Sequence, residues 1–160
     1  MTNMNGFLLP RTIIAAMTFL CVAALMSGCS KPDFFDTKGQ SGQFSDFHGK
    51  WVVINYWAEW CEPCREEIPE FNQLASEHTE KLEVLSVPFD RLSMEELAAQ
   101  VTRMGIEYRT LISDPAALLG LSKPNVLPVT YIMKPDGSFF KELLGPQTKE
   151  SIVKLLHSSK

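Results

Sequence analysis

The pattern of hydrophobic and polar positions predicts alternating strands and helices over most of the chain. The run Trp51–Trp57 is short, apolar, β-branched and aromatic, which favours a buried strand. The segment 82–88 alternates as a second strand, and the helical segment between the two runs indicates that they are parallel. A Pro-Asp-Gly sequence at 135–137 predicts a hairpin turn between the strand-like runs 131–133 and 138–144.

Three helical segments accompany these strands. The second begins at a capping box, residues 93–96, and ends before Gly105, and the third begins near Thr148. Weaker signals predict a short strand at 108–112 and a strand pair that includes Phe34, Phe35 and Phe44. The first helix, 62–78, contains Pro69, which should kink it. Its core-facing stripe consists of Cys64, Glu67, Ile68, Phe71, Leu74 and Ala75.

Two cysteines stand where the first long strand passes into the first helix. Cys61 and Cys64 are separated by two residues, so they lie on one helix face and their sulfurs can come within bonding distance. The free N–H groups at a helix N-terminus stabilise a thiolate on the first cysteine. Because the thiolate is the species that attacks disulfides, this arrangement predicts thiol–disulfide exchange.

Glu67 is the only carboxylate on the stripe that carries Cys64 and the apolar residues. Partial burial would raise its pKa and make it a candidate proton acceptor or donor for Cys64. The alternative is a glutamate that reaches solvent at the helix edge. Glu59, in the loop before Cys61, is expected to be a solvated charge.

Composition and the spacing of the histidines disfavour two other classes of function, nucleic-acid binding and metal binding. The chain has 160 residues and a formal net charge of −4, which suits one domain and disfavours a nucleic-acid partner. The histidines at 48, 78 and 157 are scattered and are expected at the surface. A zinc site would require two ligands besides the cysteine pair, and no histidine has suitable spacing. We therefore expect neither a metal nor another cofactor.

The N-terminal residues read as a leader. The apolar run Ile13–Met26, preceded by Arg11, suits a signal peptide and is shorter than the roughly 20 residues of a membrane-spanning helix. Residues 25–30 resemble a bacterial lipoprotein cleavage box, which implies cleavage before Cys29 and its lipidation. The expected organisation is a signal peptide at 1–28, a lipidated tether at 29–43 and a domain at 44–160. An uncleaved anchor helix and ordinary secretion are the alternatives.

The stretch 57–69 resembles the active site of the thioredoxin superfamily, and most closely that of the TlpA/ResA-like membrane-anchored thiol–disulfide oxidoreductases. Their Trp-Cys-x-Pro-Cys pattern followed by Glu-x-Pro is matched here, and the likeness runs from about Phe34 to His157. It implies an α/β thioredoxin fold, with a central mixed β-sheet flanked by helices and a TlpA-type helical insertion. Cytoplasmic thioredoxins have a buried aspartate where this chain has Asn55, which leaves Glu67 as the better candidate base.

The resemblance also implies roles for the residues of the motif. Cys61 would attack, Cys64 would resolve the mixed disulfide, and Glu67 would lie near the two thiols, which form a redox-active disulfide. These three residues are the candidate catalytic set.

The same resemblance points to a substrate-binding set. The peptide between Leu127 and Pro128 should be cis and face the cysteine pair, so that the backbone of Leu127 can pair with a bound substrate strand. Trp57 and Trp60 are expected to be packing residues, and Trp60 also to form the rim around Cys61.

The charge near the cysteines indicates the direction of electron flow, and the resemblance implies the partners. Glu62 places a negative charge between the cysteines and opposes the helix N-terminus, so Cys61 should be less acidic than in strong oxidants, which favours a reductase. The resemblance implies protein disulfides as substrates, apocytochrome c among them. It also implies an electron donor of the DsbD/CcdA kind, and a lipid anchor in a bacterial membrane that faces the periplasm.

Two alternatives to the reductase stay open. One is an oxidase that inserts disulfides, and the other is a copper-delivery protein on the same fold. The two-residue spacing of the cysteines and a proline facing them disfavour copper delivery.

Overall fold

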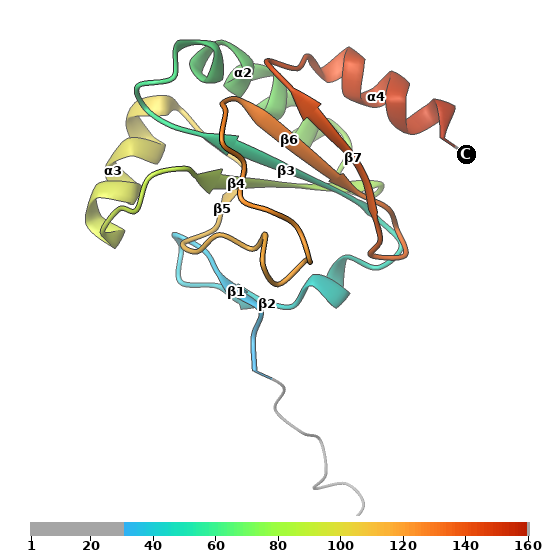
Figure 1. Ribbon diagram of the computed structural model, residues 1–160, viewed down its shortest axis with the longest axis horizontal. Coiled ribbons are helices and arrows are strands. Elements are labelled where there is room, and N and C mark those ends of the chain that lie inside the picture. Colours follow the sequence, from blue (N-terminus) through green and yellow to red (C-terminus); the bar gives the residue numbers. More distant parts are fainter. Residues whose placement is uncertain (1–30, 160) are drawn as a thin grey trace, which may run out of the picture. The chain divides into compact units, whose positions relative to one another are not determined.

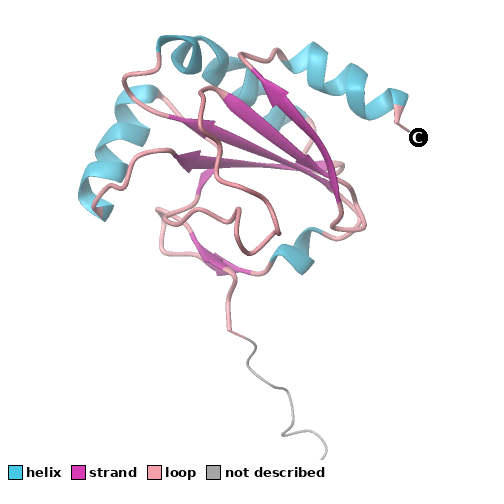
Figure 2. Ribbon diagram, in the orientation of Figure 1, coloured by secondary structure: helices cyan, strands magenta, loops and turns pink. Residues whose placement is uncertain are grey.

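Five strands form a central mixed sheet in the computed structural model, which describes residues 31–159 (Figures 1 and 2). The spatial order is β5-β4-β3-β6-β7. The pairs β3–β4 and β4–β5 are parallel, whereas β3–β6 and β6–β7 are antiparallel. The strands are β3 (Trp51–Trp57), β4 (Leu82–Pro88), β5 (Arg109–Thr110), β6 (Val129–Met133) and β7 (Phe139–Leu144).

Helices cover one face of the sheet. In Figure 1, α2 (Glu62–Glu77) and α4 (Lys149–Ser158) lie on the same side, and α3 (Met94–Met104) lies at a flank. The predicted stripe of α2 is buried except for Ala75, which is only partly buried. Pro69 lies inside α2, which continues to Glu77. The cysteine pair therefore stands at the end of a helix that is packed on the core.

The ends of α3 agree with the sequence. The Ser93 hydroxyl accepts the N–H of Glu96 at 3.2 Å, and Gly105 closes the helix with a φ of 66°. The capping box is not reciprocal, because the Glu96 carboxylate pairs with Arg103 at 2.9 Å instead of returning to the backbone of Ser93. The N-cap bond of Ser93 thus starts the helix, while Glu96 joins a surface network.

The hairpin β1 (Phe34–Phe35) and β2 (Ser41–Gly42) lies against the edge of the sheet at β5. Asp36 forms a bridge with Leu111, and the N–H of Ile112 donates to the carbonyl of Phe35 at 3.0 Å. The predicted strand pair exists, but its second strand is Ser41–Gly42. Phe44 instead begins the 3-10 helix η2 (Phe44–Phe47).

The domain begins earlier than the sequence indicated. Phe34 is buried and its ring stacks on that of Phe47, with 5.8 Å between the ring centres. The compact unit starts at Pro32 and not at residue 44, because an apolar residue within the expected tether joins the core. The expected signal peptide and Cys29 lie outside the described residues. Within residues 31–159, no helix has the length and apolar character needed to cross a membrane.

The hairpin β6–β7 is as predicted, with Gly137 at a φ of 82° in its turn. The peptide between Leu127 and Pro128, just before β6, is cis, which confirms the expectation from the resemblance. β5 is shorter than the predicted strand at 108–112.

Candidate active site

Cys61 and Cys64 are joined by a disulfide with an S–S distance of 2.02 Å. Cys61 is the N-cap of α2, and its sulfur accepts the backbone N–H of Cys64 at 3.3 Å. Cys64 is completely buried and Cys61 is nearly so. The first sulfur therefore lies where a helix N-terminus stabilises negative charge, and the second lies within the core.

Glu67 lies one helical turn after Cys64 and is only 1% exposed. Its Oε1 accepts the Asn55 side-chain amide at 2.7 Å, and its Oε2 accepts the backbone N–H of Gln147 at 2.9 Å. Burial raises the pKa of Glu67 to about 7, although the hydrogen bonds from Gln147 and Asn55 act in the opposite direction. The predicted burial is confirmed, and the carboxyl can gain or lose a proton near neutral pH.

Asn55 connects Glu67 to a tyrosine in the core. The Tyr108 hydroxyl donates to Asn55 Oδ1 at 3.0 Å, and both side chains are buried. Burial raises the pKa of Tyr108 well above its ordinary value, so the tyrosine is neutral. A hydrogen-bonded chain thus runs from Glu67 on α2, through β3, to the segment before β5.

Trp57 and Trp60 have different environments. Trp57 is completely buried and donates from Nε1 to the Ser86 hydroxyl at 2.6 Å, which confirms its packing role. The packing prediction is wrong for Trp60, whose side chain is 64% exposed. Because Trp60 follows the turn out of β3, its ring rests at the surface on Phe89 and its Nε1 donates to Asp90 at 2.8 Å.

A hollow of about 340 Å³ adjoins this loop. Asp90, Arg91, Asp114 and Lys123 line it together with Ser113 and apolar side chains. Lys123 donates to the Phe89 carbonyl at 2.6 Å. The hollow lies at the carboxyl end of β4, and it shares Asp90 with the tryptophan that precedes Cys61.

The loop with the cis peptide presents apolar surface. Val126 and Leu144 are exposed, and Leu127 packs against the core cluster that contains both cysteines. The carbonyl of Pro128 accepts the N–H of Gly145 at 2.9 Å, which fixes the loop to the end of β7. Exposed apolar side chains of this kind are common at surfaces that bind polypeptides.

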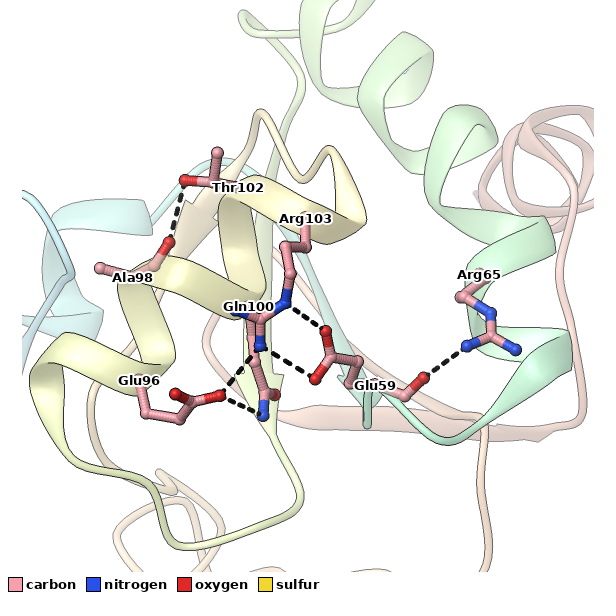
Figure 3. A network of polar contacts seen from close by, with 7 residues as sticks. All are labelled: Glu59, Arg65, Glu96, Ala98, Gln100, Thr102 and Arg103. Carbon is pink, nitrogen blue, oxygen red and sulfur yellow. Dashed lines mark hydrogen bonds and ion pairs between the residues drawn. The ribbon is translucent and has the colours of Figure 1, made fainter.

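Glu59 is more than the solvated charge that the sequence predicted. Figure 3 shows its carboxylate facing Arg103 on α3, with bonds of 2.6 and 3.0 Å, and its backbone carbonyl accepting from Arg65 on α2 at 2.8 Å. The bond from Arg103 lowers the pKa of Glu59. Arginines from two helices therefore hold the loop that leads into Cys61.

Sequence reasoning missed two hydrogen-bonding partners that come from distant parts of the chain. Gln147 binds Glu67 and Tyr108 binds Asn55, and no spacing rule relates either residue to the cysteine motif. The apolar run of β7 predicted a strand but not the exposure of Leu144 near Pro128.

The histidines lie away from the core. His48 and His157 are exposed, and His78 is half-buried. Within residues 31–159, no group of three or more histidine, cysteine, aspartate or glutamate side chains is placed to hold a metal ion.

Comparison with known proteins agrees with this geometry. The sequence profile of the AhpC/TSA family matches residues 27–139. The chain is 32% identical over 142 residues to the thiol-disulfide oxidoreductase ResA of Geobacillus kaustophilus, covering 86% of this chain and 80% of that protein. A DsbF homologue from Corynebacterium diphtheriae superposes with a TM-score of 0.66 at 27% identity, covering 77% of this chain and 80% of that one. StoA from Bacillus subtilis gives a TM-score of 0.64 at 16% identity, covering 77% and 93%. The expected thioredoxin-like fold is confirmed.

Proposed function

We propose that this chain, which belongs to the AhpC/TSA family and is related to the ResA thiol-disulfide oxidoreductases, reduces protein disulfides outside the cytoplasm through Cys61 and Cys64. The observation that carries this proposal is the arrangement at the start of α2. Cys61 is the N-cap, and Cys64 and Glu67 are buried on the face that follows. Such a site separates an attacking sulfur from a resolving sulfur and supplies a proton acceptor.

In the first step, the reduced Cys61 thiolate attacks one sulfur of a substrate disulfide. A bond forms between Cys61 and that sulfur, the substrate S–S bond breaks, and its electron pair leaves with the second substrate sulfur. The N–H of Cys64 and the N-terminus of α2 stabilise the attacking thiolate.

In the second step, Cys64 must lose its proton in a buried environment. Glu67 accepts the proton, and the Cys64 thiolate attacks the Cys61 sulfur. The Cys61–Cys64 bond forms, and the substrate leaves with both of its sulfurs reduced. A pKa of about 7 suits Glu67 to this exchange, because the acceptor then titrates near the operating pH.

Substrate binding is assigned to Trp60, Leu127 and Pro128. The exposed ring of Trp60 and the apolar loop at Leu127 would lie along an extended substrate segment. The backbone of Leu127 would pair with that segment as an added strand does.

The proposed direction is reduction. Glu62 is exposed in the first turn of α2, and its charge opposes the stabilisation of a Cys61 thiolate. Oxidised protein would be reduced again by a membrane donor of the DsbD/CcdA kind, and apocytochrome c is a candidate substrate.

An anchored, extracytoplasmic location forms part of the same proposal. Its support is the leader, with a 14-residue apolar run and a lipoprotein-like box before Cys29. We expect cleavage after residue 28, lipidation of Cys29 and exposure of the domain to the periplasm. Incorporation of a labelled fatty acid into the wild-type protein, and its loss in Cys29→Ala, would support the anchor. Equal labelling of both proteins would contradict it.

The reaction is tested by trapping its intermediate. Cys64→Ser should accumulate a mixed disulfide between Cys61 and substrate, seen by mass spectrometry, whereas Cys61→Ser should form none. Glu67→Gln should still form the mixed disulfide but release substrate more slowly. Trapping by Cys61→Ser instead would contradict the assigned order of attack.

A further inference from the structure

Three side chains form a buried hydrogen-bonded chain beneath α2. Glu67, Asn55 and Tyr108 are 1%, 0% and 6% exposed, and they come from α2, from β3 and from the segment before β5. Asn55 Nδ2 donates to Glu67 Oε1 at 2.7 Å, and the Tyr108 hydroxyl donates to Asn55 Oδ1 at 3.0 Å. Because these groups are shielded from water, the orientation of each restricts the next.

The present orientation suits a charged Glu67. Each carboxylate oxygen meets a donor, one from Asn55 and the other from the backbone N–H of Gln147. A carboxylate accepts four hydrogen bonds and donates none, whereas a protonated carboxyl has an O–H that requires an acceptor. Neither of these two neighbours offers an acceptor to Glu67 as they stand.

Rotation of the Asn55 side-chain amide can supply the missing acceptor. Rotation of the Asn55 side-chain amide by half a turn would place Oδ1 against a protonated Glu67 and Nδ2 against Tyr108. The Tyr108 oxygen would then accept from Asn55, and its own O–H would have to point elsewhere. The hydroxyl of Tyr108 therefore favours the orientation that serves the charged carboxylate.

On the basis of the function proposed above, we propose that Asn55 and Tyr108 are positioning residues for proton transfer between Cys64 and Glu67, and that the Asn55 amide turns over each time Glu67 gains or loses that proton. The step balances within the chain. Cys64 gives its proton to Glu67, and its thiolate displaces the substrate sulfur from Cys61. The electron pair of the broken S–S bond leaves with the substrate.

The remaining groups that face Glu67 come from the elements packed around it. On α2 the titratable neighbour on the same stripe is Cys64. Tyr108 interacts electrostatically with Glu67 from the segment before β5. From the segment before α4, Gln147 contributes a backbone N–H, whereas the N–H of Lys149, the first residue of α4, binds Glu70. Rotation of the Asn55 amide therefore depends on its two partners, Glu67 and Tyr108. No cation among these contacts pairs with Glu67.

Tyr108→Phe tests the proposal by removing one oxygen. Without the hydroxyl, the bias towards charged Glu67 is lost, so the pKa of Glu67 should rise by about 0.5 to 1 pH unit. The titration is followed by ¹³C NMR of the glutamate carboxyl carbons in the oxidised full-length protein, with Glu67→Gln identifying the signal. The pH profile for release of substrate from the mixed disulfide should move upward by the same amount.

Tyr131→Phe is the matched control. Tyr131 is also buried and also loses one hydrogen bond, from its hydroxyl to the Ser122 carbonyl at 2.9 Å, but it packs on the other face of the sheet. The titration of Glu67 should not move in this variant. An unchanged titration in Tyr108→Phe, or an equal movement in Tyr131→Phe, would overturn the proposal.

Two further variants keep the test decisive. Asn55→Leu removes the donor to Glu67, so the pKa of Glu67 should rise, and adding Tyr108→Phe should move it no further. If Tyr108→Phe raised the pKa of Glu67 by its full amount in the Asn55→Leu background, Tyr108 would not act through Asn55, and the proposal would be overturned. The function proposed above is tested separately by Glu67→Gln. If that variant releases substrate as fast as wild type, the proton-transfer step fails, whatever the NMR titration shows.

Discussion

Replacing the buried carboxyl by an amide should flatten the dependence of stability on pH. Glu67 has a pKa of about 7 in the folded protein and an ordinary value of 4.5. Between these values the folded state holds a proton on Glu67 that the unfolded chain has released. Stability therefore falls as pH rises through this window, and the full cost is present above pH 7.

The magnitude follows from the difference between the two pKa values. About 2.5 pH units, from 4.5 to about 7, correspond to about 3 kcal/mol at about 1.4 kcal/mol per unit. Most of the change falls between pH 5 and 8, so wild type should lose about 2 to 3 kcal/mol more over this range than Glu67→Gln. The amide NH₂ needs an acceptor where Glu67 accepts from Asn55, so the substitution also exchanges hydrogen bonds, with a loss of at most about 1 kcal/mol. That loss is independent of pH and shifts the whole curve.

The assay is urea denaturation of the oxidised proteins at intervals from pH 5 to 8, with the free energy of unfolding extrapolated to water. Every other titratable group is the same in both proteins, so the difference between the two curves isolates Glu67. Parallel curves would refute the reasoning, since they would show that Glu67 does not carry a raised pKa in the folded state.

Three further substitutions have separate expected outcomes. Phe71→Ala removes a completely buried ring on α2 and should lower the free energy of unfolding by about 3 to 5 kcal/mol, measured with urea; a loss below about 1 kcal/mol would contradict the packing. Trp60→Ala should leave stability nearly unchanged, because the ring is 64% exposed, while raising KM for a protein disulfide; an unchanged KM would remove Trp60 from the binding site. Arg103→Met breaks an exposed pair with Glu59, so it should lower the urea midpoint only slightly, and the difference should vanish in high salt. A salt-independent loss would show a packing role for Arg103.

The local part of the fold and site could be predicted from the sequence. The β-branched run of β3, the Cys-x-x-Cys pair and the stripe on α2 fall within one continuous segment, where periodicity determines which side chains share a face. That is why the position of Glu67 between Cys64 and Phe71 made it a candidate for burial, while the alternative of a glutamate that reaches solvent was decided only by the structure. The cis peptide before Pro128 came from the family resemblance and not from periodicity.

Contacts between distant segments could not be predicted in the same way. The partners of Glu67 include Gln147, which is 80 residues away, and Asn55 is joined to Tyr108 across 53 residues. Periodicity places a residue on a face but does not say which residue of another element lies opposite it. The same limit explains Glu59, whose pairing with Arg103 depends on where α3 packs.

Exposure near the site was also misjudged where the chain turns. Trp60 shares its residue type with Trp57, and both were expected to pack, but Trp57 lies in the buried strand β3 whereas Trp60 lies beyond its end, in a turn at the surface. Phe34 shows the opposite case: the expected tether included it, although a weak signal also predicted a strand there, and it stacks on Phe47 within the core.

The central claim, that the Cys61–Cys64 pair works as a reductant, is tested most directly by its reduction potential. The protein is equilibrated in a series of thiol/disulfide buffers, and free thiols are counted by mass spectrometry after alkylation. We predict a value near or below the roughly −270 mV of thioredoxin. A value near the roughly −120 mV of a strong oxidant would contradict the account and favour disulfide insertion.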